Sequence, residues 1–171
     1  MTEQNKTQKM AISAMLTALI CVTTMLITIP SPLKGYLNLG DGVVLLAGWL
    51  LPPGYGFLAA GLGSALADIF SGYVMYAPAT FVIKGLMAFV ASYGHKALMK
   101  SGNTLISHLI PGFFAEVVMV LGYYIFEGFL YGFVPSMVNI PANSVQGMAG
   151  LILGCVLIQI LDKYKIMTRA R

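Results

Sequence analysis

The sequence predicts an all-α integral membrane protein, a bundle of six transmembrane helices with both termini on the cytoplasmic side. The chain has 171 residues, of which 58% are hydrophobic and only 9% are charged, and its mean hydropathy is +0.83. A soluble domain carries about 25% charged residues, so this chain needs lipid around much of its surface. The apolar runs are separated by turn residues, and basic residues gather at alternate ends of these runs. We expect a single domain over residues 1–171.

Proline and glycine residues delimit the predicted helices, each of which needs about 20 mostly apolar residues to cross a bilayer. The first helix ends at Pro30, and the second is short and ends at Pro52. Pro111 lies inside the fifth run, where it is expected to kink the helix or to mark the end of an interfacial start. The expected helices cover residues 10–29, 37–51, 55–70, 77–98, a stretch within 104–133, and 145–161.

Positive charge sets the orientation, because cytoplasmic loops of membrane proteins are rich in Lys and Arg. The loops on the opposite side hold only Lys34, and Lys84 lies inside the fourth helix. This asymmetry predicts a multi-pass membrane protein with an N-in, C-in topology. The net charge of +4 could suggest nucleic-acid binding, but the clustering of basic residues at helix ends argues against it. The basic residues on the predicted cytoplasmic side are Lys6, Lys9, Lys96, Lys100, Lys163, Lys165, Arg169 and Arg171.

Polar side chains from distant parts of the chain fall in the outer half of the predicted bundle. Charged groups within a membrane are costly and therefore mark functional sites by default. The alternative is that they pair with one another, with Asp68 or Glu116 as the partner of Lys84. Surplus acids such as Glu127, and crowded tyrosines such as Tyr123, favour a wet cavity with aromatic walls. The predicted substrate-binding residues are Tyr36, Asn38, Asp41, Asp68, Tyr73, Tyr76, Lys84, Glu116, Asn143 and Gln146.

Small residues form a stripe on the first predicted helix, where Ala11, Ala14 and Ala18 are spaced three and four apart. In lipid, small residues allow helices to approach closely. The stripe therefore predicts either internal packing or a face that docks a separate membrane subunit. A similar stripe on the third helix, which includes Gly63, is expected to pack inside the bundle.

The sequence offers no catalytic or metal-binding motif. His95 and His108 lack zinc-ligand spacing, and the two cysteines sit within apolar runs, as buried hydrophobic residues do. We therefore expect no enzyme activity, no metal and no cofactor. Without an ATP-binding segment, the chain must let a solute diffuse, bind it, or take energy from a partner.

The longest specific stretch, residues 36–89, reads YLNLGDGVVLLAGWLLPPGYGFLAAGLGSALADIFSGYVMYAPATFVIKGLMAF. Its NLGD, ALAD, SGY…AP and KG segments resemble those of the S components, the substrate-binding membrane subunits of energy-coupling factor (ECF) vitamin transporters. Ala14 and Ala18 are similar to the AxxxA motif with which that family docks its coupling subunit. The resemblance covers nearly the whole chain.

The resemblance implies an ABC-type importer in which the S component binds a vitamin at the outer face. Its implied partners are an EcfT-type coupling subunit, two ATPase subunits and membrane lipid, and it topples to deliver the vitamin inward. Residues 31–41 become a lid over the ligand. The chain looks most like members for pyridoxine or hydroxymethylpyrimidine; pantothenate would meet too many acids, and riboflavin needs a larger pocket. The alternatives are a small membrane enzyme with Glu116 or Glu127 as its base, or a stand-alone carrier.

Overall fold

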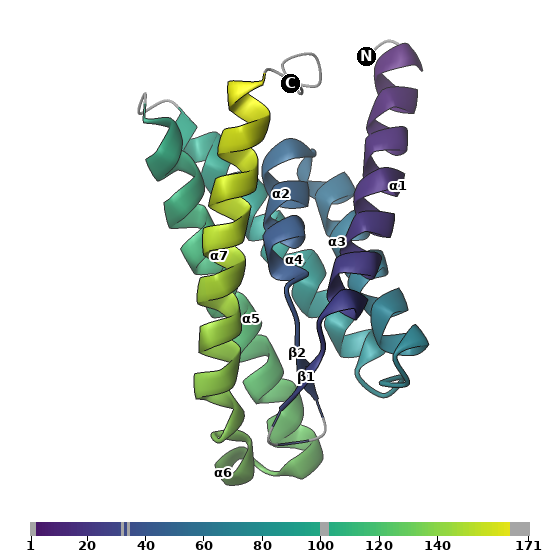
Figure 1. Cartoon of the computed structure of the whole chain (residues 1–171), viewed down its shortest axis with the longest axis vertical. Helices are drawn as coiled ribbons and strands as arrows, with labels where there is room; N and C mark the ends of the chain where they lie inside the picture. Colours follow the sequence, from purple (N-terminus) through teal and green to yellow (C-terminus); the bar gives the residue numbers. More distant parts are fainter. Residues whose placement is uncertain (1–2, 32, 34, 100–102, 165–171) are drawn as a thin grey trace.

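The computed structural model describes residues 3–31, 33, 35–99 and 103–164, which form a helical bundle with a small hairpin at one end (Figure 1). The strands β1 (Ile29–Pro30) and β2 (Tyr36–Leu37) pair antiparallel between the first two helices. The helices are α1 (Glu3–Leu26), α2 (Asp41–Leu50), α3 (Pro53–Phe70), α4 (Ala77–Leu98), α5 (Thr104–Tyr131), the short α6 (Phe133–Ser136) and α7 (Asn139–Lys163).

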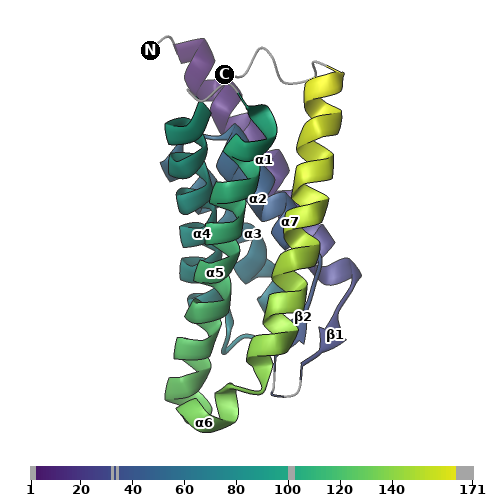
Figure 2. The ribbon, with the colours of Figure 1, turned by 90° about the vertical axis from the view of Figure 1, so that its left-hand side faces the viewer.

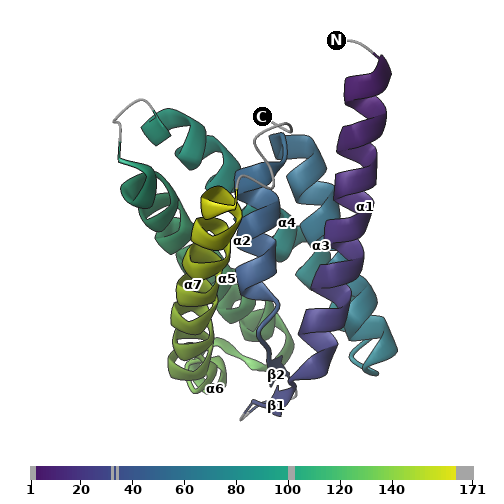
Figure 3. The same cartoon turned by 45° about the horizontal axis from the view of Figure 1, so that its top comes forward.

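The central element is α2, which contacts each of the other five long helices. Around it the helices follow the order α1, α3, α4, α5, α7 (Figure 3). After Asp41 its sequence contains no polar side chain except the indole of Trp49, and every residue from Asp41 to Trp49 is buried. A helix that is apolar on all sides belongs inside a bundle. With ten residues, α2 is too short to span a bilayer alone, and its neighbours cover it.

Three expected helix starts differ clearly from the structure. The first helix begins at Glu3 rather than at residue 10. The second helix begins at Asp41, four residues later than expected, because residues 36–37 pair with β1 and Asn38 forms a turn. The Asn38 side chain accepts a hydrogen bond from the Gly40 N–H at 2.9 Å, a local bond that competes with helix formation. The last helix begins at Asn139 rather than at residue 145, after the short α6. Pro111 lies inside α5, which continues through it.

Small residues hold the bundle together by close backbone approach, as they do in membrane helices generally. A Cβ at Gly63 of α3 would lie 2.6 Å from the Thr17 carbonyl oxygen of α1. A Cβ at Gly150 of α7 would lie 2.6 Å from the Asp41 Cβ of α2. The prediction that the small-residue face of the third helix packs internally is confirmed: Ala59, Gly63 and Ala67 are all buried.

Four described segments are long and apolar enough to cross a membrane, namely Lys6–Leu26, Ala77–Leu98, Thr104–Tyr131 and Phe133–Lys163. Their outward faces carry many exposed large hydrophobic side chains. Such surfaces suit lipid rather than water.

The two ends of the bundle differ in character. The start of α1, the end of α4 and the end of α7 lie together at one end, whereas the hairpin and α6 lie at the other (Figures 1 and 2). Lys6 and Lys9 occupy the first turns of α1, Lys96 the last turn of α4, and Lys163 ends α7. The other basic residues used to predict the topology, Lys34, Lys100, Lys165, Arg169 and Arg171, lie outside the described residues.

Candidate ligand-binding site

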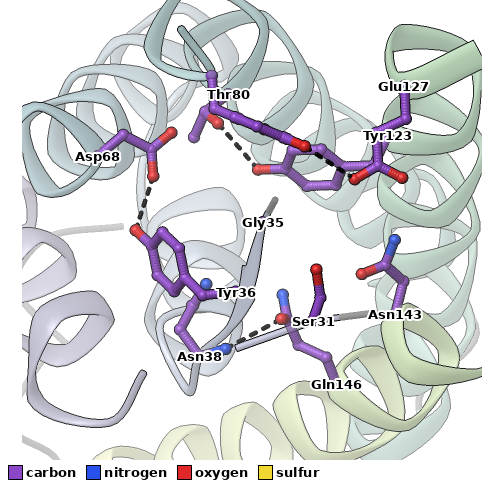
Figure 4. Close-up of a pocket in the computed structure, with 11 residues that line it drawn as sticks. Ser31, Gly35, Tyr36, Asn38, Asp68, Thr80, Tyr123, Glu127, Asn143 and Gln146 are labelled. Carbon is purple, nitrogen blue, oxygen red and sulfur yellow. Dashed lines mark hydrogen bonds between the residues drawn. The ribbon is translucent and has the colours of Figure 1, made fainter. Parts of the chain in front are cut away.

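A cavity of about 400 Å³, counting its open mouth, lies beneath the hairpin at the end of the bundle opposite the helix ends that carry the lysines (Figure 4). The hairpin, the turn before α4, and the helices α3, α4, α5 and α7 all contribute to its wall. The lining residues are Ser31, Gly35, Tyr36, Asn38, Asp68, Tyr76, Thr80, Tyr123, Glu127, Asn143 and Gln146.

Three hydrogen bonds fasten the hairpin segment over the cavity. The Leu33 N–H donates to Asn139 Oδ1 of α7 at 3.3 Å, and the Asn38 N–H donates to Gln146 Oε1 of α7 at 3.0 Å. The Tyr36 hydroxyl donates to Asp68 Oδ1 of α3 at 2.6 Å. The hairpin thus bridges α3 and α7 over the cavity.

Tyr36 is the residue that joins the hairpin to the α3 wall. Burial, followed by the neighbouring Asp68 carboxylate, raises the pKa of its phenol above the usual range. The hydroxyl is therefore protonated at physiological pH, so it donates to Asp68. The Tyr36 ring also packs against Tyr73, with 4.6 Å between the ring centroids and 45° between the planes.

Next to the cavity, a buried ion pair joins α2 to α4. Lys84 Nζ donates to Asp41 Oδ1, and the two side chains are 2% and 0% exposed. Gln146 of α7 donates from Nε2 to the other oxygen of Asp41 at 2.6 Å. The Asn38 N–H occupies Gln146 Oε1, which fixes the amide with its nitrogen toward Asp41. One side chain therefore connects the hairpin to the ion pair.

Glu116 of α5 lies beside this pair. It is 6% exposed, and neither of its carboxyl oxygens has a hydrogen-bond partner among the described residues. A Cβ at Gly150 would lie 2.6 Å from Asp41 Cβ and 3.1 Å from Glu116 Oε1. The two acids therefore face the same glycine of α7, which leaves room for both.

The structure divides the predicted substrate-binding residues into two groups. Asp41, Lys84 and Glu116 form the buried cluster and do not line the cavity, while Tyr73 packs against Tyr36. The predicted partner of Lys84, either Asp68 or Glu116, is wrong, because Lys84 binds Asp41 instead. Six predicted residues line the cavity: Tyr36, Asn38, Asp68, Tyr76, Asn143 and Gln146.

Five lining residues were not selected from the sequence: Ser31, Gly35, Thr80, Tyr123 and Glu127. Two of them carry a signal that helical spacing reveals. Tyr123 follows Glu116 by seven residues, and Glu127 follows Tyr123 by four. At this spacing all three side chains lie on one face of α5. Ser31 and Gly35 belong to the hairpin, whose pairing no short pattern in the sequence indicates.

The alanine stripe of α1 faces away from the bundle. Ala11, Ala14 and Ala18 are exposed, whereas Leu16 and Ile20 on the opposite face are buried against the other helices. The stripe is therefore not used for packing within the described part of the chain.

The described residues include no group of three or more His, Cys, Asp or Glu side chains placed to hold a metal ion. His95 and His108 stack on each other with 4.3 Å between ring centroids. They pack near Trp49 and the ends of α4 and α5 that lie far from the hairpin. The histidines therefore lie away from Asp68 and Glu127, the acids that line the cavity.

Comparison with known families decides the class. The model of the family described as ECF-type riboflavin transporter, S component, matches residues 4–163. The chain belongs to this family of S components. Members of the family are transporter subunits and not enzymes, and with its long apolar helices this S component is a multi-pass membrane protein.

Two relatives match most of the S component. An uncharacterized protein of Pyrococcus woesei is 39% identical over 145 residues, which cover 84% of this chain and 95% of the relative. The thiamine precursor transporter HmpT of Lactococcus lactis subsp. cremoris (strain MG1363) is 27% identical over 166 residues, covering 96% of this chain and 93% of the relative.

Solved structures share the fold. The S component of a bacterial ECF transporter aligns with a TM-score of 0.69 at 24% identity, covering 93% of this chain and 98% of the other. The S component for biotin from an ECF-type ABC transporter aligns with a TM-score of 0.68 at 20% identity. The alignment covers 99% of this chain and 100% of the other. At these identities the likeness concerns the fold alone.

The ion pair yields a testable prediction. Lys84→Met leaves Asp41 buried without its cation, and breaking a buried pair in this way costs about 3–5 kcal/mol. We expect the free energy of unfolding in detergent to fall by that amount. The double variant Asp41→Asn/Lys84→Met removes both charges and should regain more than half of the loss. If Lys84→Met instead unfolds like the wild type but loses ligand affinity, Lys84 is a ligand-binding residue.

Proposed function

We propose that this S component captures a small heterocyclic B-vitamin or vitamin precursor at the outer face of the bacterial cell membrane. Pyridoxine and hydroxymethylpyrimidine are the proposed ligands. The observation that carries the proposal is the polar cavity beneath the hairpin. It has aromatic and hydrogen-bonding walls, and side chains of the hairpin cover it.

The distribution of charge supports an outward-facing cavity. Lysines occupy the ends of α1, α4 and α7 that lie opposite the hairpin. The positive-inside rule assigns this end to the cytoplasm, which gives an N-in, C-in topology. The cavity then faces the outside, where an importer must first bind its substrate.

The wall chemistry supports a flat ring with polar substituents. Tyr36, Tyr76 and Tyr123 contribute aromatic surface, and Asn143 and Gln146 contribute amide groups. Apolar walls with a few placed polar groups are typical of small-molecule sites. The likeness to a thiamine precursor transporter agrees with hydroxymethylpyrimidine. Riboflavin, which the family description names, is the principal competitor.

The exposed alanines of α1 support a docking role. S components work with an EcfT-type coupling subunit and an ATPase module, and small residues on a lipid-facing helix permit close contact with another helix. We propose that Ala11, Ala14 and Ala18 form this contact. ATP hydrolysis by two partner ATPases then drives the S component to topple and release its ligand inward.

Calorimetry with the purified S component tests the ligand proposal. Pyridoxine or hydroxymethylpyrimidine should bind at micromolar concentration or below, with no partner subunit present. If riboflavin binds and these two do not, the ligand assignment is wrong. If no B-vitamin binds, the substrate-capture role is wrong. Product formation by the isolated chain would favour an enzyme, and uptake into vesicles without ATPases would favour a stand-alone carrier.

A bulky residue in the alanine stripe tests docking. Ala14→Trp should abolish co-purification with the coupling subunit while changing the dissociation constant of the vitamin less than twofold, because α1 does not line the cavity. Ala97→Trp is the control, since Ala97 is also an exposed alanine but lies on α4. Equal loss of the complex in both variants would show that the effect is not specific to the stripe.

A further inference from the structure

The cavity contains two carboxylates that face it from different walls. Asp68 comes from α3 and Glu127 from α5, two helices separated by α4. Both side chains are almost fully buried, with 4% and 2% exposure. In the close-up they lie on either side of the open space (Figure 4).

The hydrogen bonds of Glu127 show that it acts as an acceptor. The Leu33 N–H occupies Asn139 Oδ1, so the amide nitrogen of Asn139 points the other way. That nitrogen donates to both oxygens of Glu127, at 2.9 and 3.0 Å, and the Tyr76 hydroxyl donates to Oε1 at 3.3 Å. These donors are all neutral. None of them would offset a negative charge on Glu127.

One carboxylate oxygen of Asp68 has no hydrogen-bond partner among the described residues. Oδ1 accepts from the Tyr36 hydroxyl, so the oxygen without a partner is Oδ2. A buried carboxylate oxygen without a partner is costly, because burial strips it of water. A donor supplied by a ligand would remove this cost.

Asn143 is a second unpartnered group at the same cavity. It is 8% exposed, its side chain makes no hydrogen bond within the described part of the protein, and it points toward the open centre (Figure 4). An amide buried in this way is held ready for a ligand group. It is independent of the acids, since it comes from α7.

Among the described residues, no Lys or Arg side chain forms part of the cavity wall. Lys84 is committed to Asp41. Two acids therefore share a cavity whose described wall carries no positive charge. Burial of charge without a partner is unfavourable, so a cationic ligand would offset negative charge on these two acids.

We propose that the cavity selects an organic cation: a protonated amine or amino-substituted nitrogen heterocycle that donates N–H bonds toward Asp68 and Glu127, with Asn143 binding a neutral polar substituent. This inference rests on the proposed ligand-binding function and narrows its substrate class. It favours hydroxymethylpyrimidine, which carries an amino group and a protonatable ring nitrogen, over pyridoxine. It excludes ligands that carry a carboxylate or a phosphate group.

Matched ligand pairs test the selectivity by calorimetry on the full-length S component. The pairs are pyridoxamine against pyridoxine, and hydroxymethylpyrimidine against its analogue with a hydroxyl in place of the amine. A hydrogen bond to a charged group is worth about 1.5–3 kcal/mol, which corresponds to roughly 10- to 100-fold in affinity. The amine of each pair should bind tighter by that factor, and pyridoxal phosphate should not bind.

The isosteric variants Glu127→Gln and Asp68→Asn locate the source of the selectivity. Each should reduce the amine-to-hydroxyl affinity ratio at least fivefold, while Ser144→Ala, a change in α7 away from the cavity wall, should leave it unchanged. Unfolding curves without ligand show whether each variant folds. If a variant fails to fold, the wild-type ratios alone decide.

The outcomes separate this inference from the proposed function. If the hydroxyl or anionic members bind as tightly as the amines, the protein captures vitamins but cation selectivity is wrong. If Lys34→Gln creates amine selectivity that the wild type lacks, Lys34 supplies the compensating charge and the inference is also wrong. If no member of either pair binds, the inference fails together with the proposed ligands.

Discussion

The structure depends on one buried ion pair at the start of its central helix. Asp41 opens α2, Lys84 comes from the middle of α4, and Gln146 of α7 donates to the same carboxylate. In a lipid-embedded bundle neither charge could stand alone, so these helices must meet in one register. Because α2 contacts all the other long helices, the position of its start constrains the helices that surround it.

The polar residues therefore divide into two layers with different tasks. In the inner layer, Lys84 and Gln146 satisfy the Asp41 carboxylate, and this contact joins α2 to α4 and α7. The outer layer, with Asp68 and Asn143, is left incompletely satisfied and faces a cavity. Gln146 belongs to both layers, because it binds Asp41 on one side and the hairpin backbone on the other. The Gln146 amide thus links the hairpin backbone to the buried ion pair.

Much of this could be predicted from the sequence, and the exceptions have physical reasons. The lengths of the apolar runs predicted the long helices and their order. The placement of the lysines predicted which end of the bundle carries the polar residues. The hairpin was missed because its pairing depends on contacts across a turn. The partner of Lys84 was misassigned because depth along a helix does not specify which neighbour it faces. Glu127 was recognised as a surplus acid, but its place in the wall required the packing of α5 against α7.

The position of a bound ligand is the most direct test. A structure of the S component with hydroxymethylpyrimidine should show the ring beneath the hairpin, with Asp68 and Asn143 within hydrogen-bonding distance and the Asp41–Lys84 pair intact. A ligand that contacts Lys84 after breaking its bond to Asp41 would contradict the division into two layers. A ligand bound outside the cavity would contradict the site itself.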